Sequence, residues 1–238
     1  SIDVDCFTFI ASDDNERRIN AGIQSKHFTN YTLTGSWNRS TLNRGMLANR
    51  GASQRLSLEL SVPGSDLEYY KVTYQAQRYL RVTNAWTLRF RTELGYGDGY
   101  SDTERLPFYK HYFAGGFGSV RGYSDRSLGP EDSSGSSRAF GGNLLTEGSI
   151  ELIFPTPFVK DRRSVRTAFY LDGGNVFDSN RTDEEGLDLD MSEIRYSVGV
   201  GLTWITGVGP LTFNYSRAFN HSDDDRTRGF NFSLGQSF

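Results

Sequence analysis

The side chains most often used for catalysis or metal binding are scattered along this 238-residue sequence. Three histidines occur, and none has a cysteine or glutamate partner at metal-ligand spacing. They are His27, His111 and His221. No G-x-S-x-G elbow occurs, and the dinucleotide-like pair Gly116 and Gly118 is followed by Arg121 where a third glycine should stand. The sequence therefore predicts a protein that is not an enzyme and that has no metal site and no cofactor.

The net charge and the cysteine content exclude further classes of function and structure. The net charge of −3 leaves no basic footprint for nucleic acid, and the single Cys6 can form no internal disulfide. The acidic runs Asp183–Glu185 and Asp223–Asp225 contain the ligand type that divalent cations prefer. Solvated loop charge is the interpretation we favour for both runs.

Arg121 is the residue whose surroundings need a chemical explanation. It lies in Val120-Arg121-Gly122-Tyr123, inside Phe108–Pro130, a stretch too long and too glycine-rich for a simple hairpin turn. Loops of this length are usually functional or disordered, and the many aromatic side chains argue against disorder. We expect an ordered loop that folds back into a barrel and carries Arg121 inside. An unpaired buried charge is costly, so the guanidinium needs carboxylate partners there.

The elements that would surround such a loop are strands with two different faces. Apolar and polar residues alternate in nine segments, as they do in strands with one apolar and one polar face. The segments are His27–Ser40, Ser53–Val62, Tyr70–Leu80, Trp86–Tyr96, Asn143–Phe154, Val165–Phe177, Ile194–Trp204, Leu211–Phe219 and Phe230–Phe238. Residues 1–27 are less readable, and Ile2–Ile10 is left open as a further strand.

Two all-β architectures fit this alternation, a soluble β-sandwich and a transmembrane β-barrel. Apolar residues make up only 36% of the sequence, which alone favours the sandwich, and no apolar run approaches the ~18 residues of a transmembrane helix. A barrel strand needs only ~10 residues, of which every second one faces lipid. Charges recur on the polar faces of several strands, where they polarise a lumen or bind loop carbonyls and carboxylates. The arginines among them are Arg89, Arg91, Arg166 and Arg195. This recurrence favours the barrel.

Strand parity points two acids to the same inner face, Glu151 in SIEL and Asp172 in YLDGG. They lie on neighbouring predicted strands, so both are candidates to receive Arg121 and hold the loop in the lumen. The alternative is that both acids only line a wet channel.

The connections alternate between long polar segments and short or proline-rich ones, as outer loops and periplasmic turns do in such barrels. Two connections break this rule. Leu42–Ala52 is long for the inner side, and Pro63–Glu68 is short for the outer side.

The last predicted strand places Phe230, Phe232, Leu234 and the terminal Phe238 on one face. Gly235 interrupts it, and a glycine within a strand often marks a bend. The pattern fits a C-terminal signal of an outer-membrane protein, and an ordinary amphipathic edge strand is the alternative.

Motifs spread over nearly the whole chain carry a family resemblance. FAGG followed by SVRGY and LGP resembles the sixth extracellular loop of the BamA family, the outer-membrane protein assembly factors of Gram-negative bacteria. The other matching motifs are TLNRG (Thr41–Gly45), VPGSDLEYYKV (Val62–Val72), GYGDG (Gly95–Gly99), FPTPF (Phe154–Phe158) and GPLTFNYSRAF (Gly209–Phe219).

The resemblance implies a fold and a set of site residues. The fold would be an antiparallel transmembrane barrel of about sixteen strands, with this chain supplying about the last nine as one domain and lacking the POTRA domains. Residues 108–142 would form the long extracellular loop. Glu151 and Asp172 match the positions that receive the loop arginine in the family, and Gly235 matches a glycine that lets the last strand kink beside a lateral seam.

The function implied by the resemblance is insertion of nascent β-barrel proteins into the bacterial outer membrane, by lateral opening and strand templating. The implied partners are these clients, BAM accessory lipoproteins bound through the intact protein, and outer-membrane lipid and lipopolysaccharide, with no nucleic acid. A two-partner-secretion or translocation-assembly type transporter is the main alternative, and a porin-like channel or a structural β-domain are weaker ones. No signal peptide begins at Ser1, so we expect a fragment or processed piece. Without the first strand, we do not expect it to be an active insertase alone.

Overall fold

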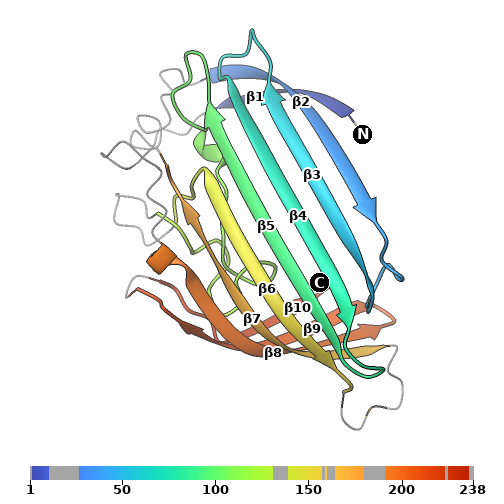
Figure 1. The fold of residues 1–238 in the computed structure, drawn as a ribbon. Helices are drawn as coiled ribbons and strands as arrows, with labels where there is room; N and C mark the ends of the chain where they lie inside the picture. Colours follow the sequence, from blue (N-terminus) through green and yellow to red (C-terminus); the bar gives the residue numbers. More distant parts are fainter. Residues whose placement is uncertain are drawn as a thin grey trace.

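In the computed structural model, the chain forms one antiparallel sheet of ten strands whose order in space is their order in the sequence (Figure 1). The structure describes residues 2–10, 27–130, 139–156, 159, 164–179, 191–222 and 225–235. The strands are β1 (Ile2–Ile10), β2 (His27–Ser40), β3 (Gly51–Ser61), β4 (Tyr69–Arg81), β5 (Thr87–Gly99), β6 (Leu144–Phe154), β7 (Val165–Phe177), β8 (Arg195–Thr206), β9 (Gly209–Phe219) and β10 (Phe230–Leu234). All nine expected strands are present, and the segment left open at Ile2–Ile10 is a tenth.

The sheet is open and strongly curled. The strands β2–β5 form one wall, while β8–β10 turn away and cross the lower part of the view (Figure 1). Each strand pairs with the next in sequence, so β1 and β10 are the two edges. No helix among the described residues is long and apolar enough to cross a membrane. The all-β antiparallel fold is therefore confirmed, in the form of a partial barrel.

Each strand turns one face to the inside of the curl and one face outward. On β6 and β7, the apolar Ile150 and Leu171 are paired neighbours and both are exposed on the outer face. The polar Ser149, Glu151 and Asp172 alternate with them and are buried on the inner face. Exposed apolar side chains outside and charged side chains inside are the arrangement of a transmembrane barrel, not of a soluble sandwich.

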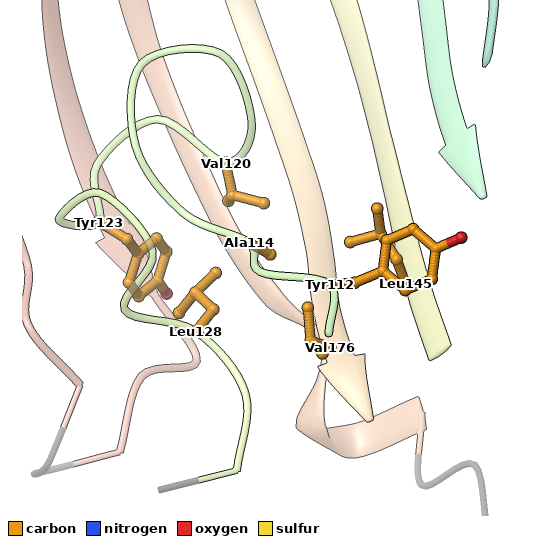
Figure 2. Close-up of a cluster of buried hydrophobic side chains, with 7 residues drawn as sticks. All are labelled: Tyr112, Ala114, Val120, Tyr123, Leu128, Leu145 and Val176. Atoms are coloured by element: carbon orange, nitrogen blue, oxygen red, sulfur yellow. The ribbon is translucent and has the colours of Figure 1, made fainter. Parts of the chain in front are cut away.

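The connection between β5 and β6 folds back against the inner face of the sheet; we call its residues 108–130 the inner loop. It begins with the 3-10 turn η1 (Phe108–Lys110), and isolated bridges join Ala114 to Leu128 within it and Tyr112 to Gly142 after it. Its apolar side chains pack against β6 and β7 (Figure 2). The buried cluster consists of Tyr112, Ala114, Val120, Tyr123, Leu128, Leu145 and Val176. A loop with a core of its own is an ordered part of the fold.

Close approach of the inner loop depends on a glycine of β5. A Cβ atom added at Gly95 would lie 2.5 Å from the ring of Tyr112. The hydroxyl of Tyr112 reaches past Gly95 and donates a 2.7 Å hydrogen bond to the carbonyl of Val72 on β4. The glycines of the GYGDG motif therefore leave room for the loop to lie flat on the sheet.

The β2–β3 connection, residues 41–50, also folds inward, which accounts for its unexpected length. Its base is closed by a 2.8 Å hydrogen bond from the amide of Thr41 to the carbonyl of Ala52. Near its tip, the buried Ala48 accepts a hydrogen bond through its carbonyl from Nη2 of Arg166 on β7. The connection thus reaches across the inside of the curl to a strand that is far away in the sheet.

Candidate functional site

The inner loop brings Arg121 against the inner face of β7. Its Nε donates to Oδ2 of Asp172 at 2.6 Å, and its Nη2 donates to Oδ1 at 2.7 Å, which makes the pair bidentate. The backbone amide of Arg121 also donates to Oδ2 of Asp172, at 3.1 Å. One carboxylate therefore holds both the side chain and the backbone of the loop.

A second carboxylate engages the same guanidinium from β6. Nη1 of Arg121 lies 2.8 Å from Oε1 of Glu151, while the other oxygen of Glu151 is 3.1 Å from Nη1 of Arg89 on β5. Ser149 completes the arrangement, because its hydroxyl accepts from Nη2 of Arg121 and donates to Oδ1 of Asp172. The result is a network that joins three adjacent strands to one loop residue.

This network is shielded from solvent. The side chains of Arg121 and Asp172 are 3% and 0% exposed, and the guanidinium lies 3.5 Å from the ring centre of Tyr170. Forming a buried ion pair adds little net stability, but removing one partner costs about 3–5 kcal/mol because a buried charge is left alone. The network therefore fixes the position of the loop more than it raises the stability of the sheet.

The neighbours of Arg121 fix the loop in other ways. Gly122 has a φ of +99°, and a Cβ atom there would lie 3.0 Å from Cβ of Ser197 on β8. Tyr123 is fully buried, and its hydroxyl donates a 3.0 Å hydrogen bond to the carbonyl of Phe219 at the end of β9. Val120 is fully buried in the cluster of Figure 2. Each residue of the four-residue motif thus has a distinct structural task.

A second contact between the loop and the strands lies two to three residues before Arg121. The sequence predicted the strand residues of this contact but not their loop partners. Arg91 of β5 donates to the carbonyl oxygens of Gly118 and Ser119, the latter at 2.9 Å. The hydroxyl of Ser119 donates to Oε1 of Glu147 on β6. Strand alternation placed Arg91 and Glu147 inward, but nothing in the sequence paired them with this part of the loop. Ser149 and Tyr170 were missed for the same reason.

The inner loop is also joined to the segment that precedes β10. The amide of Ser124 donates to the carbonyl of Arg226, and the amide of Arg228 donates to the carbonyl of Gly122, both at 2.8 Å. Tyr123 forms an isolated bridge with Thr227 between these two hydrogen bonds. The loop therefore contacts the chain directly before the edge strand.

The edge strand β10 is short. It pairs with β9 only from Leu211 to Tyr215. Phe230, Phe232 and Leu234 are exposed on its outer face, as the alternation predicted. The strand stops before Gly235, whose φ is +87°, while Phe238 lies outside the described residues.

The remaining candidates contribute little to this site. Residues 180–190 and 223–224, which include most of both acidic runs, lie outside the described residues, as does the side chain of His27. Asp225 is described and pairs with Arg195 at 2.5 Å. His221 is exposed, and His111 is held in the loop by the carbonyls of Leu106 and Phe140. Within the described part of the chain, no group of His, Cys, Asp and Glu is arranged to hold a metal ion.

An outward apolar face, a polar inner face and an internally anchored loop define an outer-membrane β-barrel. The chain belongs to the Omp85 superfamily, whose domain model matches residues 7–238. It is 32% identical over 228 residues to the outer membrane protein assembly factor BamA of Neisseria meningitidis, which covers 87% of this chain. It is 29% identical over 225 residues to the sorting and assembly machinery component 50 homolog A of Xenopus laevis, covering 90% of this chain.

A solved structure agrees with these sequence relatives. The crystal structure of BamA from Haemophilus ducreyi lacking POTRA domains 1–3 matches 92% of this chain with a TM-score of 0.78 and 30% sequence identity. The chain spans 29% of the Neisseria protein, 47% of the Xenopus protein and 45% of the Haemophilus chain. The chain therefore spans less than half of the length of each of these relatives.

Proposed function

We propose that this chain is the C-terminal part of the barrel of an outer-membrane assembly factor, which inserts nascent β-barrel proteins into the outer membrane. The relatives with this barrel are named as assembly factors in bacteria and as sorting and assembly machinery in a eukaryote. The observation that carries the proposal is the attachment of the inner loop to both the strand wall, through Arg121 and Asp172, and the segment before β10.

The proposed mechanism uses backbone hydrogen bonds and no nucleotide hydrolysis. An edge strand offers unpaired amides and carbonyls to an incoming chain, so β10 can template a client strand by β-augmentation. In the complete barrel, the seam between the first strand and β10 opens sideways to admit that strand. The Arg121 network holds the loop in the lumen while the seam opens and closes.

The proposed surroundings follow from the same assignment. Residues 108–130 and 139–142, the described part of the expected long loop, lie on the extracellular side, and the opposite end of the barrel faces POTRA domains and accessory lipoproteins. The outer face contacts outer-membrane lipid and lipopolysaccharide. The chain performs no chemical catalysis in this role.

A depletion and rescue experiment tests this function. Native BamA is depleted in a Gram-negative host, the full-length protein is supplied, and the level of folded outer-membrane proteins is measured. We expect rescue by the wild type, failure by Arg121→Glu, and rescue by Arg126→Glu, which changes an exposed arginine of the same loop.

The other outcomes are informative. Rescue by Arg121→Glu would support the assembly function but would show that the Arg121 network is not required for it. Failure of the wild type, although it is folded in the membrane, would favour a secretion transporter that exports one substrate and leaves general barrel assembly unchanged.

A further inference from the structure

A small cavity lies beside the Arg121 network, on the side of the β2–β3 connection. Its volume is about 20 Å³. The lining residues are Leu47, Arg89, Arg121, Glu151, Arg166, Ala168, Gly201 and Thr203. Leu47 contributes the wall from the inward-folded connection and has a φ of +48°, in the left-handed region. The cavity is thus formed between that connection and the inner faces of the strands.

The charges around the cavity do not balance. Three guanidinium groups line it, and arginine cannot lose its proton in a protein. Arg121 is paired with Asp172 and with one oxygen of Glu151, while the other oxygen of Glu151 faces Arg89. Two carboxylates therefore serve three guanidinium groups, and one positive charge is left over. Arg166 makes no ion pair with any described residue. Its Nη2 donates to the carbonyl of Ala48, and its guanidinium lies 5.7 Å from the ring centre of Tyr79.

The polar groups around the cavity are mainly donors. Nε of Arg89 is buried and has no hydrogen-bond partner among the described residues. The hydroxyl oxygen of Thr203 accepts from the hydroxyl of Thr212 at 3.3 Å, which leaves the proton of Thr203 to be donated elsewhere. An anion that accepts hydrogen bonds would pair with these donors and offset the positive charge. A cation would be repelled by the guanidinium groups.

The volume limits the occupant to a single small particle. A space of roughly 10–15 Å³ holds one water-sized centre, and the cavity offers about 20 Å³, which suits a single monatomic ion. We propose that this cavity binds one small monovalent anion of the halide class, with Arg89, Arg166 and Thr203 as its donors. The anion would neutralise the unmatched arginine charge and join the β2–β3 connection to the Arg121 network.

Halide-dependent stability tests the proposal on the full-length protein in detergent. Sodium chloride replaces sodium gluconate at constant ionic strength, and the melting temperature is followed by the loss of the folded form on semi-native gels. We expect a saturable upward shift with chloride and with bromide. Ala168→Val, which fills the cavity without changing charge, should abolish the shift. Ala76→Val on the outer face is the matched control and should keep it.

Bromide also locates the ion directly. Crystals of the wild type grown in bromide should show an anomalous peak within the cavity, between Arg89 and Arg166. Absence of both the halide-specific shift and the peak would mean that water alone fills the space and would overturn the proposal. A shift that persists in Ala168→Val without a peak in the cavity would place the ion elsewhere and would also overturn it.

Discussion

The backbone amide of Arg228 donates a 2.8 Å hydrogen bond to the carbonyl oxygen of Gly122. This contact lies one residue after the arginine that is held by Asp172 and two residues before the edge strand β10. The loop network and the edge strand are therefore neighbours through the backbone itself. We therefore expect a change in the loop to affect the edge strand through this backbone contact, and the reverse.

Replacing Gly122 by alanine should disturb this junction. The residue has a φ of +99°, and an added Cβ would press on Ser197, so strain of about 1–3 kcal/mol is expected. The measurement is the temperature at which the folded form disappears on semi-native gels. Gly118→Ala is the control, because a Cβ there meets nothing within 4 Å. Equal behaviour of the two variants would contradict the assigned role of Gly122.

The Arg121–Asp172 pair should show strong coupling in a double-mutant cycle. Arg121→Met leaves the buried Asp172 without its counter-charge, and Asp172→Asn leaves Arg121 to share Glu151 with Arg89. Removing one partner of a buried pair costs about 3–5 kcal/mol. The double variant should lose much less than the sum of the two. Arg121→Lys should also be impaired, because an ammonium group cannot reproduce the bidentate geometry. Additive losses would argue against a direct pair.

Gly95→Ala should displace the inner loop through Tyr112. The added Cβ would lie 2.5 Å from the tyrosine ring, and the loop cluster cannot move without losing buried contacts. Limited proteolysis should therefore cut the loop of this variant faster than the loop of the wild type. A second change, Tyr112→Ala, removes the clash, so the added cost of Gly95→Ala should vanish in that background. If Gly95→Ala still accelerates proteolysis in the Tyr112→Ala background, the contact between Gly95 and the Tyr112 ring is not the cause of the effect.

The anchoring of the loop around His111 should weaken in mild acid. Burial lowers the pKa of His111 below its ordinary value of 6.5, although hydrogen bonds to two carbonyls and the charge of Asp178 act in the opposite direction. A histidine whose folded pKa is depressed contributes its full stability above pH 6.5 and loses it as the pH falls from there towards the folded pKa. Proteolysis of the loop should accelerate over this window. His111→Gln should make the rate of loop proteolysis less dependent on pH. An unchanged pH dependence would show that another group is responsible.

Much of this architecture follows from local sequence pattern. Alternation alone gave the nine strands β2–β10 and placed Glu151 and Asp172 on one inner face, because a strand has a side-chain period of two. Arg121 stands out as the bulky cation in the long loop, and the need of a buried guanidinium for counter-charge then points to these two acids. Gly235 marked the end of β10, and its positive φ supplies the physical reason.

Other contacts depend on the path of irregular backbone, which has no period to follow. Nothing near Ala48 in the sequence indicates that its carbonyl meets Arg166 across the sheet. The placement of Ser149 between Arg121 and Asp172 depends on the register of β6 with β7, where Ser149 is paired with Asp172. The sequence of residues 1–27 does not decide whether Ile2–Ile10 is a strand, and its backbone pairing with β2 settles the place of β1 in the sheet.

The shortness of β10 has a consequence for the energy of moving the loop. After Tyr215, β9 no longer pairs with β10, and its backbone groups bond to residues outside the strands. The amide of Ser216 donates to the carbonyl of Gly229, and the carbonyl of Phe219 accepts from the hydroxyl of Tyr123. Backbone groups without partners in a lipid environment cost several kcal/mol each. If the inner loop withdraws, the carbonyl of Phe219 loses the hydroxyl of Tyr123. We therefore expect withdrawal to be easier when an incoming backbone supplies a new donor to that carbonyl.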